Sequence, residues 1–74
     1  MSMAAVLYVR ADCPFCAAAR LRLAAQGRAF REIDVGRAPE SIPELLKLTG
    51  GRRIVPVLVD GRHIAVAPDG GTEF

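Results

Sequence analysis

The 74-residue sequence has only two cysteines, no tryptophan and no long apolar run. Its longest apolar run, residues 3–9, is far shorter than the ~20 residues that span a bilayer, and no basic-start secretory leader is visible. Three Phe, one Tyr and a net charge of +2 form no basic and aromatic stripe of the kind that binds nucleic acid. We therefore expect a cytoplasmic protein without nucleic-acid or membrane partners, and we expect it to be a monomer.

The composition of the sequence is that of a small folded protein. Apolar residues make up 51% and charged residues 24% of the chain, which is enough for a core and too little charge for disorder. The length fits a single domain over residues 1–74.

The apolar pattern and the turn residues predict alternating strands and helices. The expected order is β-α-β-α-β-β, an α/β fold with a mixed four-stranded sheet and helices packed on it. The expected strands are residues 4–9, 29–35, 54–59 and 62–67, and the expected helices are residues 14–26 and 41–49.

Local signals set the ends of these elements. Pro14 suits a first helical turn, and the helix that follows would bury Ala17, Leu21 and Ala24 on one face. The second helix would begin with a capping box between Ser41 and Glu44 and end at residues 50–51. A two-residue turn at residues 60–61 would connect the last two strands.

The chemistry-bearing motif is Cys13-Pro14-Phe15-Cys16, placed where a strand gives way to a helix. The thiolate is the nucleophile in disulfide exchange, and the amino end of a helix favours an anion. Cys13 would therefore attack a disulfide, and Cys16, one turn further in, would resolve the mixed disulfide. Arg10 is expected to stabilise the thiolate, with Asp12 turned toward solvent or capping backbone amides.

The two cysteines allow two other interpretations. Zinc normally takes four ligands, and only His63 could join the cysteines, so no metal is expected and His63 is interpreted as a surface residue of the hairpin. Inert buried cysteines fit poorly with a proline between them at a strand–helix junction. Pro56, which opens a strand, is either an ordinary trans proline or a cis proline that exposes backbone beside the thiol.

Together these pieces resemble the glutaredoxin family of the thioredoxin superfamily. The resemblance covers most of the chain and is carried by Arg10-x-x-Cys13-Pro14-Phe15-Cys16, Thr49-Gly50, Val55-Pro56 and Asp60-Gly61-Arg62-His63-Ile64. It implies a thioredoxin-like fold with a cis Val55–Pro56 bond, and a thiol–disulfide oxidoreductase that reduces disulfides or glutathione mixed disulfides. It also implies glutathione as the electron-donating co-substrate, with no bound cofactor. The glutathione-binding residues it implies are Arg10, Phe15, Arg52, Arg53, Val55, Pro56, Gly70, Gly71 and Thr72.

The chain also departs from the family pattern. Ile54 stands where Thr is usual, residues 51–53 are one residue longer than the common spacing, and the Gly-Gly motif comes late, at Gly70-Gly71. The usual last helix is missing, since the sequence stops at Phe74. These features are similar to the divergent bacterial Uxx-star group, some of whose members carry selenocysteine in place of Cys13.

Three alternatives stay open at this point. The same thiols could draw electrons from thioredoxin reductase or another protein. A dimer could hold an iron–sulfur cluster with Cys13 and two glutathiones. The sequence could also be a domain cut from a larger protein.

Overall fold

The computed structural model describes residues 5–74. Ala4, the first residue of the first expected strand, lies outside the described residues. The elements are β1 (Ala5–Val9), α1 (Pro14–Ala25), β2 (Phe30–Asp34), a 3-10 turn η1 (Pro39–Ser41), α2 (Ile42–Thr49), β3 (Ile54–Val55), β4 (Val57–Asp60), β5 (His63–Val66) and β6 (Thr72–Glu73).

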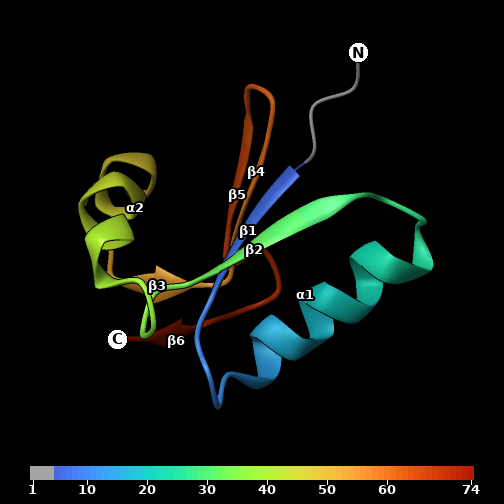
Figure 1. Ribbon diagram of the computed structural model, residues 1–74, viewed down its shortest axis with the longest axis horizontal. Coiled ribbons are helices and arrows are strands. Elements are labelled where there is room, and N and C mark those ends of the chain that lie inside the picture. The colour runs from blue at the N-terminus through green and yellow to red at the C-terminus, as the bar shows by residue number, and fades with distance from the viewer. Residues whose placement is uncertain (1–4) are drawn as a thin grey trace.

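The main sheet has four strands in the order β2-β1-β4-β5. β1 runs parallel to β2, with Ala5 opposite Phe30, and antiparallel to β4, with Leu7 opposite Leu58. β4 and β5 form the antiparallel hairpin. α1 and α2 cover opposite sides of this sheet (Figure 1). The predicted mixed four-stranded α/β architecture is therefore confirmed.

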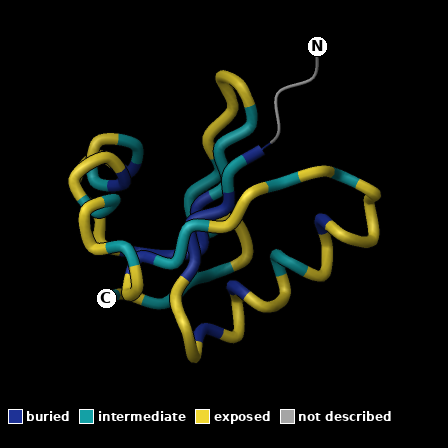
Figure 2. Tube along the Cα trace, in the orientation of Figure 1, coloured by how far each residue is buried: buried dark blue, intermediate teal, exposed yellow. Residues whose placement is uncertain are grey.

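The core lies where the central strands meet the inner faces of the two helices. Figure 2 shows the buried residues gathered along these strands, with exposed residues on the outer faces of the helices. The largest fully buried side chains are Leu7, Leu45, Val9, Val35, Val55, Val57 and Cys16. Cys16 is therefore part of the core, and Cys13 belongs to the same buried cluster.

The buried face of α1 differs from the predicted one. Ala17, Leu21 and Ala24 are all exposed, whereas Cys16 and Leu23 are buried and Ala19 packs against the core between them. Because Ala occurs on every face of this helix, the spacing of its apolar residues predicted a buried stripe that is one position away from the observed buried stripe.

The predicted capping box of the second helix was also wrong. The 3-10 turn η1 precedes α2, so the Ser41 backbone is already helical, and its hydroxyl donates to the Ala38 carbonyl oxygen at 2.6 Å. A cap serine normally has extended backbone, which turns its hydroxyl toward the helix amides. The predicted end of the helix is confirmed, because Gly50 has a left-handed backbone with φ of 70°.

The expected strand over residues 54–59 is divided at Pro56. β3 leaves the main sheet and pairs antiparallel with β6, which the sequence pattern did not predict, while β4 stays in the main sheet (Figure 1). The Val55–Pro56 peptide bond is cis. The hairpin turn is shifted by one residue to Gly61-Arg62, because Asp60 pairs with His63 across the hairpin.

Within residues 5–74, no helix is both long enough and apolar enough to cross a membrane.

Candidate active site

Cys13 lies at the junction between β1 and α1. It is the N-cap residue of α1, with extended backbone, and its Sγ accepts a hydrogen bond from the Cys16 amide at 3.1 Å. Asp12 just before it has a left-handed backbone with φ of 60°, a conformation that Asp tolerates better than most residues. The Asp12 side chain is exposed, as expected. The sharp turn at Asp12 thus brings the Cys13 sulfur onto the amino end of the helix.

The surroundings of the Cys13 sulfur favour its anion. Burial raises the pKa of this thiol, but hydrogen bonds from the Cys16 thiol, the Thr72 hydroxyl and the backbone amides of Cys16 and Phe15 outweigh burial. The net pKa of Cys13 lies below its ordinary value. Donors that stabilise a thiolate in this way make it available as a nucleophile at lower pH.

Cys16 has the opposite character. It is almost completely buried, and burial is the main reason why its pKa is raised to about 12; its hydrogen bond and charge interaction with Cys13 act in the same direction. Both cysteines are free thiols in the structure. The pair therefore combines one activated sulfur with one that keeps its proton, as the sequence predicted for these two positions.

The segment around Pro56 forms a second wall of the site. The Cys13 Sγ lies 4.0 Å from the Val55 carbonyl oxygen, although 42 residues separate the two in the sequence. Val55 and Pro56 are both buried. The structure therefore brings the Cys13 sulfur close to the backbone of a residue that was predicted to bind glutathione.

The late Gly-Gly segment folds back onto this wall. Thr72 is opposite Val55 in the β3–β6 pairing. Gly71 is so close that an added Cβ would lie 2.4 Å from the Val55 carbonyl oxygen, and a Cβ at Gly70 would lie 2.8 Å from the Phe15 ring. Two of the predicted glutathione-binding residues, Gly71 and Thr72, thus lie against Val55, and Gly70 lies against the Phe15 ring, in spite of the unusual spacing.

The arginines are placed differently from expectation. Arg10 is not among the groups that lower the Cys13 pKa; its Nη1 instead donates to the Glu73 carbonyl oxygen at 3.5 Å. Arg53 donates through Nε to the Phe74 carbonyl oxygen at 2.9 Å. Arg52 and Arg53 line a hollow with Glu73 and Phe74 that contains neither cysteine.

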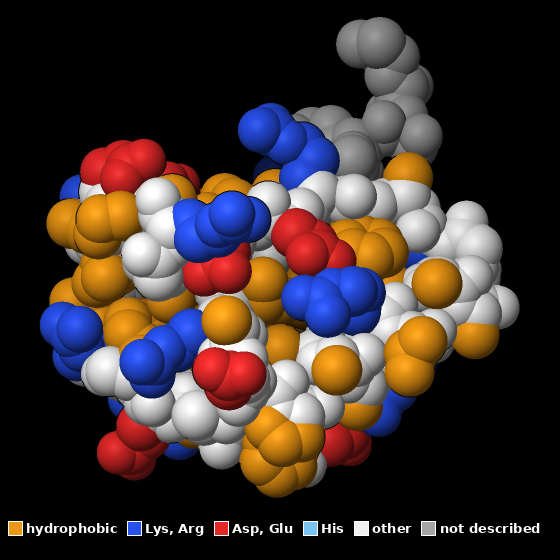
Figure 3. Space-filling model, turned by 60° about the horizontal axis from the view of Figure 1, so that its bottom comes forward, with side chains coloured by type: hydrophobic (Ala, Val, Ile, Leu, Met, Phe, Trp, Pro, Cys, Tyr) orange, Lys and Arg blue, Asp and Glu red, His pale blue; other side chains and the backbone are white. Residues whose placement is uncertain are grey.

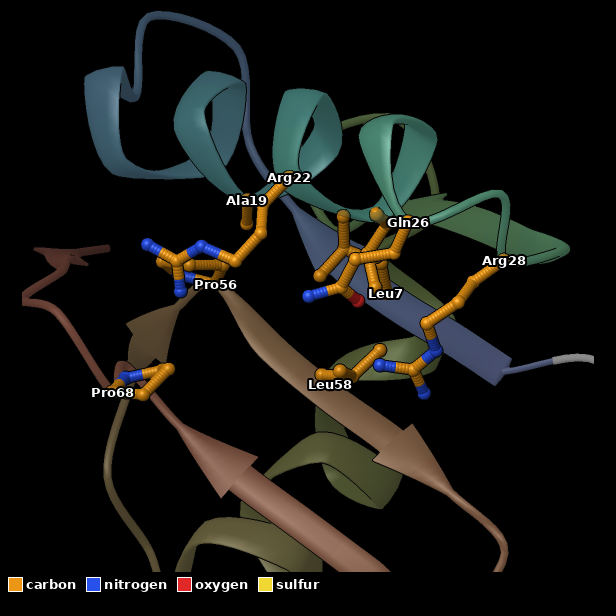
Figure 4. Close-up of a pocket in the computed structure, with 9 residues that line it drawn as sticks. Leu7, Ala19, Arg22, Gln26, Arg28, Pro56, Leu58 and Pro68 are labelled. Carbon is orange, nitrogen blue, oxygen red and sulfur yellow. The ribbon is translucent and has the colours of Figure 1, made fainter.

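Two further hollows flank the site. An open one of about 480 Å³ borders Cys13 and is lined by Arg10, Ala11, Asp12, Cys13, Pro14, Ala17 and Arg20. A smaller apolar pocket of about 170 Å³ lies between α1 and the sheet, where Leu7, Pro56 and Leu58 face α1 (Figure 4). No cysteine lines this second pocket. Of these two hollows, only the open one borders Cys13.

Charged side chains of both signs are interspersed on one face of the molecule. On the face shown in Figure 3, basic and acidic side chains alternate and form no broad patch of one sign. In the described part of the chain, no three His, Cys, Asp or Glu side chains come together as a metal site would require. His63 is exposed, and it pairs across the hairpin with Asp60.

The effect of Thr72 on Cys13 was not predicted from the sequence. Thr72 was predicted to bind glutathione, and Arg10 was predicted to stabilise the thiolate. Cys13 and Thr72 are 59 positions apart in the sequence, which hides their contact, and the strand that creates it is only two residues long. The only available signal was the pair of glycines just before Thr72, which permits close approach of two backbones.

Comparisons with known proteins identify the family. The family model described as Glutaredoxin matches residues 5–64. Glutaredoxin 3 of Escherichia coli K12 is 25% identical over 63 residues, which cover 85% of this chain and 76% of the relative. Glutaredoxin 1 of Rickettsia conorii is 31% identical over 61 residues, which cover 80% of this chain and 60% of the relative. The chain, with its thioredoxin-like fold and its Cys13–Cys16 pair, therefore belongs to the glutaredoxin family of thiol–disulfide oxidoreductases.

Proposed function

We propose that this protein reduces protein disulfides and glutathione mixed disulfides, with Cys13 as nucleophile, Cys16 as resolving thiol and glutathione as electron donor. The observation that carries the proposal is that the pKa values of the two thiols are shifted in opposite directions. Cys13 caps α1 and its pKa is lowered, whereas Cys16 is held protonated with a pKa of about 12.

The proposed reaction is a two-electron exchange. The Cys13 thiolate attacks one sulfur of a substrate disulfide, forms a mixed disulfide and expels the other sulfur as a thiolate, which takes a proton from water. Cys16 then loses its proton, attacks the Cys13 sulfur and releases the second substrate thiol. Two glutathione molecules reduce the resulting Cys13–Cys16 disulfide and leave as oxidised glutathione. The chemistry requires only the thiols and no resident cofactor.

For glutathione mixed disulfides, a shorter route is open. Cys13 takes up the glutathionyl group, and a second glutathione attacks that group, so Cys16 is not needed. In this proposal the glutathione main chain lies along Val55, near Phe15, Pro56 and the residues 70–72, and its carboxylates are bound by the guanidinium groups of Arg10, Arg52 or Arg53.

The test is a reduction assay with hydroxyethyl disulfide, with a glutathionylated peptide and with a protein disulfide, each with and without glutathione. Cys13→Ser should abolish activity on all three. Cys16→Ser should retain reduction of the glutathionylated peptide and lose reduction of a protein disulfide. Activity that survives in Cys13→Ser but not in Cys16→Ser would reverse the assignment of the two roles.

One observation favours a second electron donor. The main-chain edge of Val55 is already paired with Thr72, which disfavours glutathione binding and leaves a protein reductase as an alternative source of electrons. Turnover with NADPH and thioredoxin reductase, measured beside turnover with glutathione, separates the two donors. Either donor operates in a reducing compartment, and we propose that the protein works in the cytoplasm as a monomer.

A further inference from the structure

The backbone of Val55 is the main-chain edge that an extended substrate would use. Its carbonyl oxygen lies 4.0 Å from the attacking Cys13 sulfur. A disulfide that reacts with Cys13 must bring its own sulfur to that point, so the main chain on either side of the substrate sulfur comes within reach of Val55. Extended peptides bind such edges by adding a strand.

In this protein, the chain itself supplies that strand. Thr72 and Glu73 pair antiparallel with Val55 and Ile54, and the Phe74 amide donates to the Arg53 carbonyl oxygen at 3.0 Å. Hydrogen-bonded and non-bonded pairs alternate along antiparallel strands. Because Phe74 and Arg53 are bonded, the next bonded pair is Thr72 with Val55, which uses the polar backbone groups of Val55.

Two arginines assigned to glutathione carboxylates also contact this segment. Arg10 donates to the Glu73 carbonyl oxygen at 3.5 Å, and Arg53 donates to the Phe74 carbonyl oxygen at 2.9 Å. The Arg53 guanidinium carbon also lies 5.0 Å from the centre of the Phe74 ring, within the range of a cation–π contact. The β6 segment, residues 72–74, thus occupies both the backbone edge and the cationic groups.

We propose that the β6 segment is an internal competitor for the substrate main chain, so that glutathionyl and peptide disulfides react fully only after they displace it from Val55. This inference rests on the function proposed above. It identifies the β6 segment as the feature that distinguishes one class of disulfide substrate from another. Small disulfides without a peptide main chain do not need the Val55 edge and react through the open hollow beside Cys13.

The segment is suited to displacement. Its pairing is only two residues long, and an isolated two-stranded pairing is marginal in water. Both arginine contacts are made by exposed side chains, where ionic and cation–π interactions are weak. Phe74 is partly buried against the core and is the main apolar anchor of the segment.

The test compares two substrates in single-turnover reactions of the reduced protein, with the products trapped by acid and identified by mass. Phe74→Ala removes the anchor and leaves both cysteines, Thr72 and the arginines in place. The ratio of the rate with a glutathionylated peptide to the rate with hydroxyethyl disulfide should rise by about fivefold, equivalent to about 1 kcal/mol. The ratio is the readout because a change in the hydrogen bond from Thr72 to Cys13 affects both substrates alike. Ile64→Ala, a truncation of a half-exposed apolar side chain on the hairpin, is the matched control and should change neither rate.

The outcomes distinguish the two proposals. Wild-type protein that reacts with neither substrate would refute the proposed function. Wild-type protein that reacts, together with a Phe74→Ala variant in which the ratio of the two rates is unchanged, would overturn the role of the β6 segment while the function stands.

A second measurement does not depend on how well that variant folds. In Cys16→Ser protein, the Phe74 amide should be protected from hydrogen exchange by its bond to Arg53. When Cys13 carries a glutathionyl group, this protection should fall several-fold, while the Leu7 amide in the main sheet keeps its protection. Unchanged protection at Phe74 would show that glutathione binds without displacing the segment.

Discussion

At the scale of single residues, Cys13 and Cys16 lie one helical turn apart but differ strongly in acidity. Burial raises the pKa of both thiols, and only Cys13 has enough hydrogen-bond donors to reverse that effect. Part of the raised pKa of Cys16 comes from its bond to Cys13 and from the charge there. Once Cys13 enters a mixed disulfide, that charge is gone, so the pKa of Cys16 falls at the step at which it must attack.

Thr72 tunes the Cys13 thiolate from the far end of the sequence. Thr72→Val removes the hydroxyl that donates to the sulfur, so the pKa of Cys13 should rise toward its ordinary value. The check is the pH profile of alkylation by iodoacetamide, whose midpoint should move to higher pH. Thr72→Ser restores a hydroxyl and should restore most of the wild-type profile. A profile unchanged in Thr72→Val would show that the backbone amides and Cys16 are sufficient.

Arg10 provides the contrasting case. The sequence analysis expected this guanidinium to lower the Cys13 pKa, but its contact in the structure is with the Glu73 carbonyl oxygen. Arg10→Ala should therefore leave the midpoint of the alkylation profile in place. An upward shift as large as that of Thr72→Val would restore the original role of Arg10.

At the scale of elements, the packing of β6 on β3 depends on a glycine. An added Cβ at Gly71 would lie 2.4 Å from the Val55 carbonyl oxygen and 2.8 Å from the Ala67 Cβ. Gly71→Ala should therefore lower the free energy of unfolding by about 1–3 kcal/mol, the usual cost of overpacking, as measured by urea denaturation. Gly36→Ala is the control, because its new Cβ would meet only the Asp34 side chain, at 3.2 Å. Equal losses in the two variants would contradict this account of the β3–β6 contact.

The elements that could be predicted from the sequence are those with a local signal. Pro14 at the first turn and Gly50 at the end of α2 act within a few residues, and both were read correctly. The face of α1 could not be predicted, because Leu21 and Leu23 are equally apolar and only the sheet decides that Leu23 is buried. The predicted capping box at Ser41 was wrong because a 3-10 turn comes before α2 and gives Ser41 a helical backbone.

In the candidate site, too, the features with a local signal could be predicted and those that depend on distant contacts could not. The place of the two cysteines at a strand–helix junction, and the deeper burial of Cys16, could be predicted from one motif. The contact between Thr72 and Cys13, and the pairing of β6 with β3, join segments far apart in the sequence through a strand of two residues. Such a strand is too short to show a period-2 pattern. The pairing of Thr72 with Val55 could therefore be recognised only from the structure.

At the scale of the whole molecule, the redox pair is also part of the hydrophobic core. Cys13 and Cys16 belong to the same buried cluster as Leu7, Leu45 and Val57. Folding therefore changes the acidity of both thiols, and the stability of the reduced protein must depend on pH through them.

The direction of that dependence follows from the two shifts. Between the lowered pKa of Cys13 and the ordinary cysteine value of about 8.5, the unfolded chain binds more protons than the folded protein, so stability rises with pH. Above about pH 8.5, an unfolded Cys16 loses its proton while the folded one keeps it up to about pH 12, so stability falls. The cysteines should therefore give the reduced protein its greatest thermal stability near their ordinary pKa.

This maximum can be measured as the thermal midpoint of the reduced protein between about pH 7 and pH 9.5, below the ordinary Tyr pKa of about 10. The upper limit matters because burial, together with Glu44, also raises the pKa of Tyr8 and adds a loss of stability at higher pH. The Cys13→Ser/Cys16→Ser double variant keeps Tyr8 and should lose the cysteine-dependent part of the curve. Cys13→Ser alone should lose the rise below the maximum, and Cys16→Ser alone the fall above it. If the double variant has the same curve as the wild type, folding does not shift the acidity of these thiols, and the assignment of nucleophile and resolving residue loses its electrostatic basis.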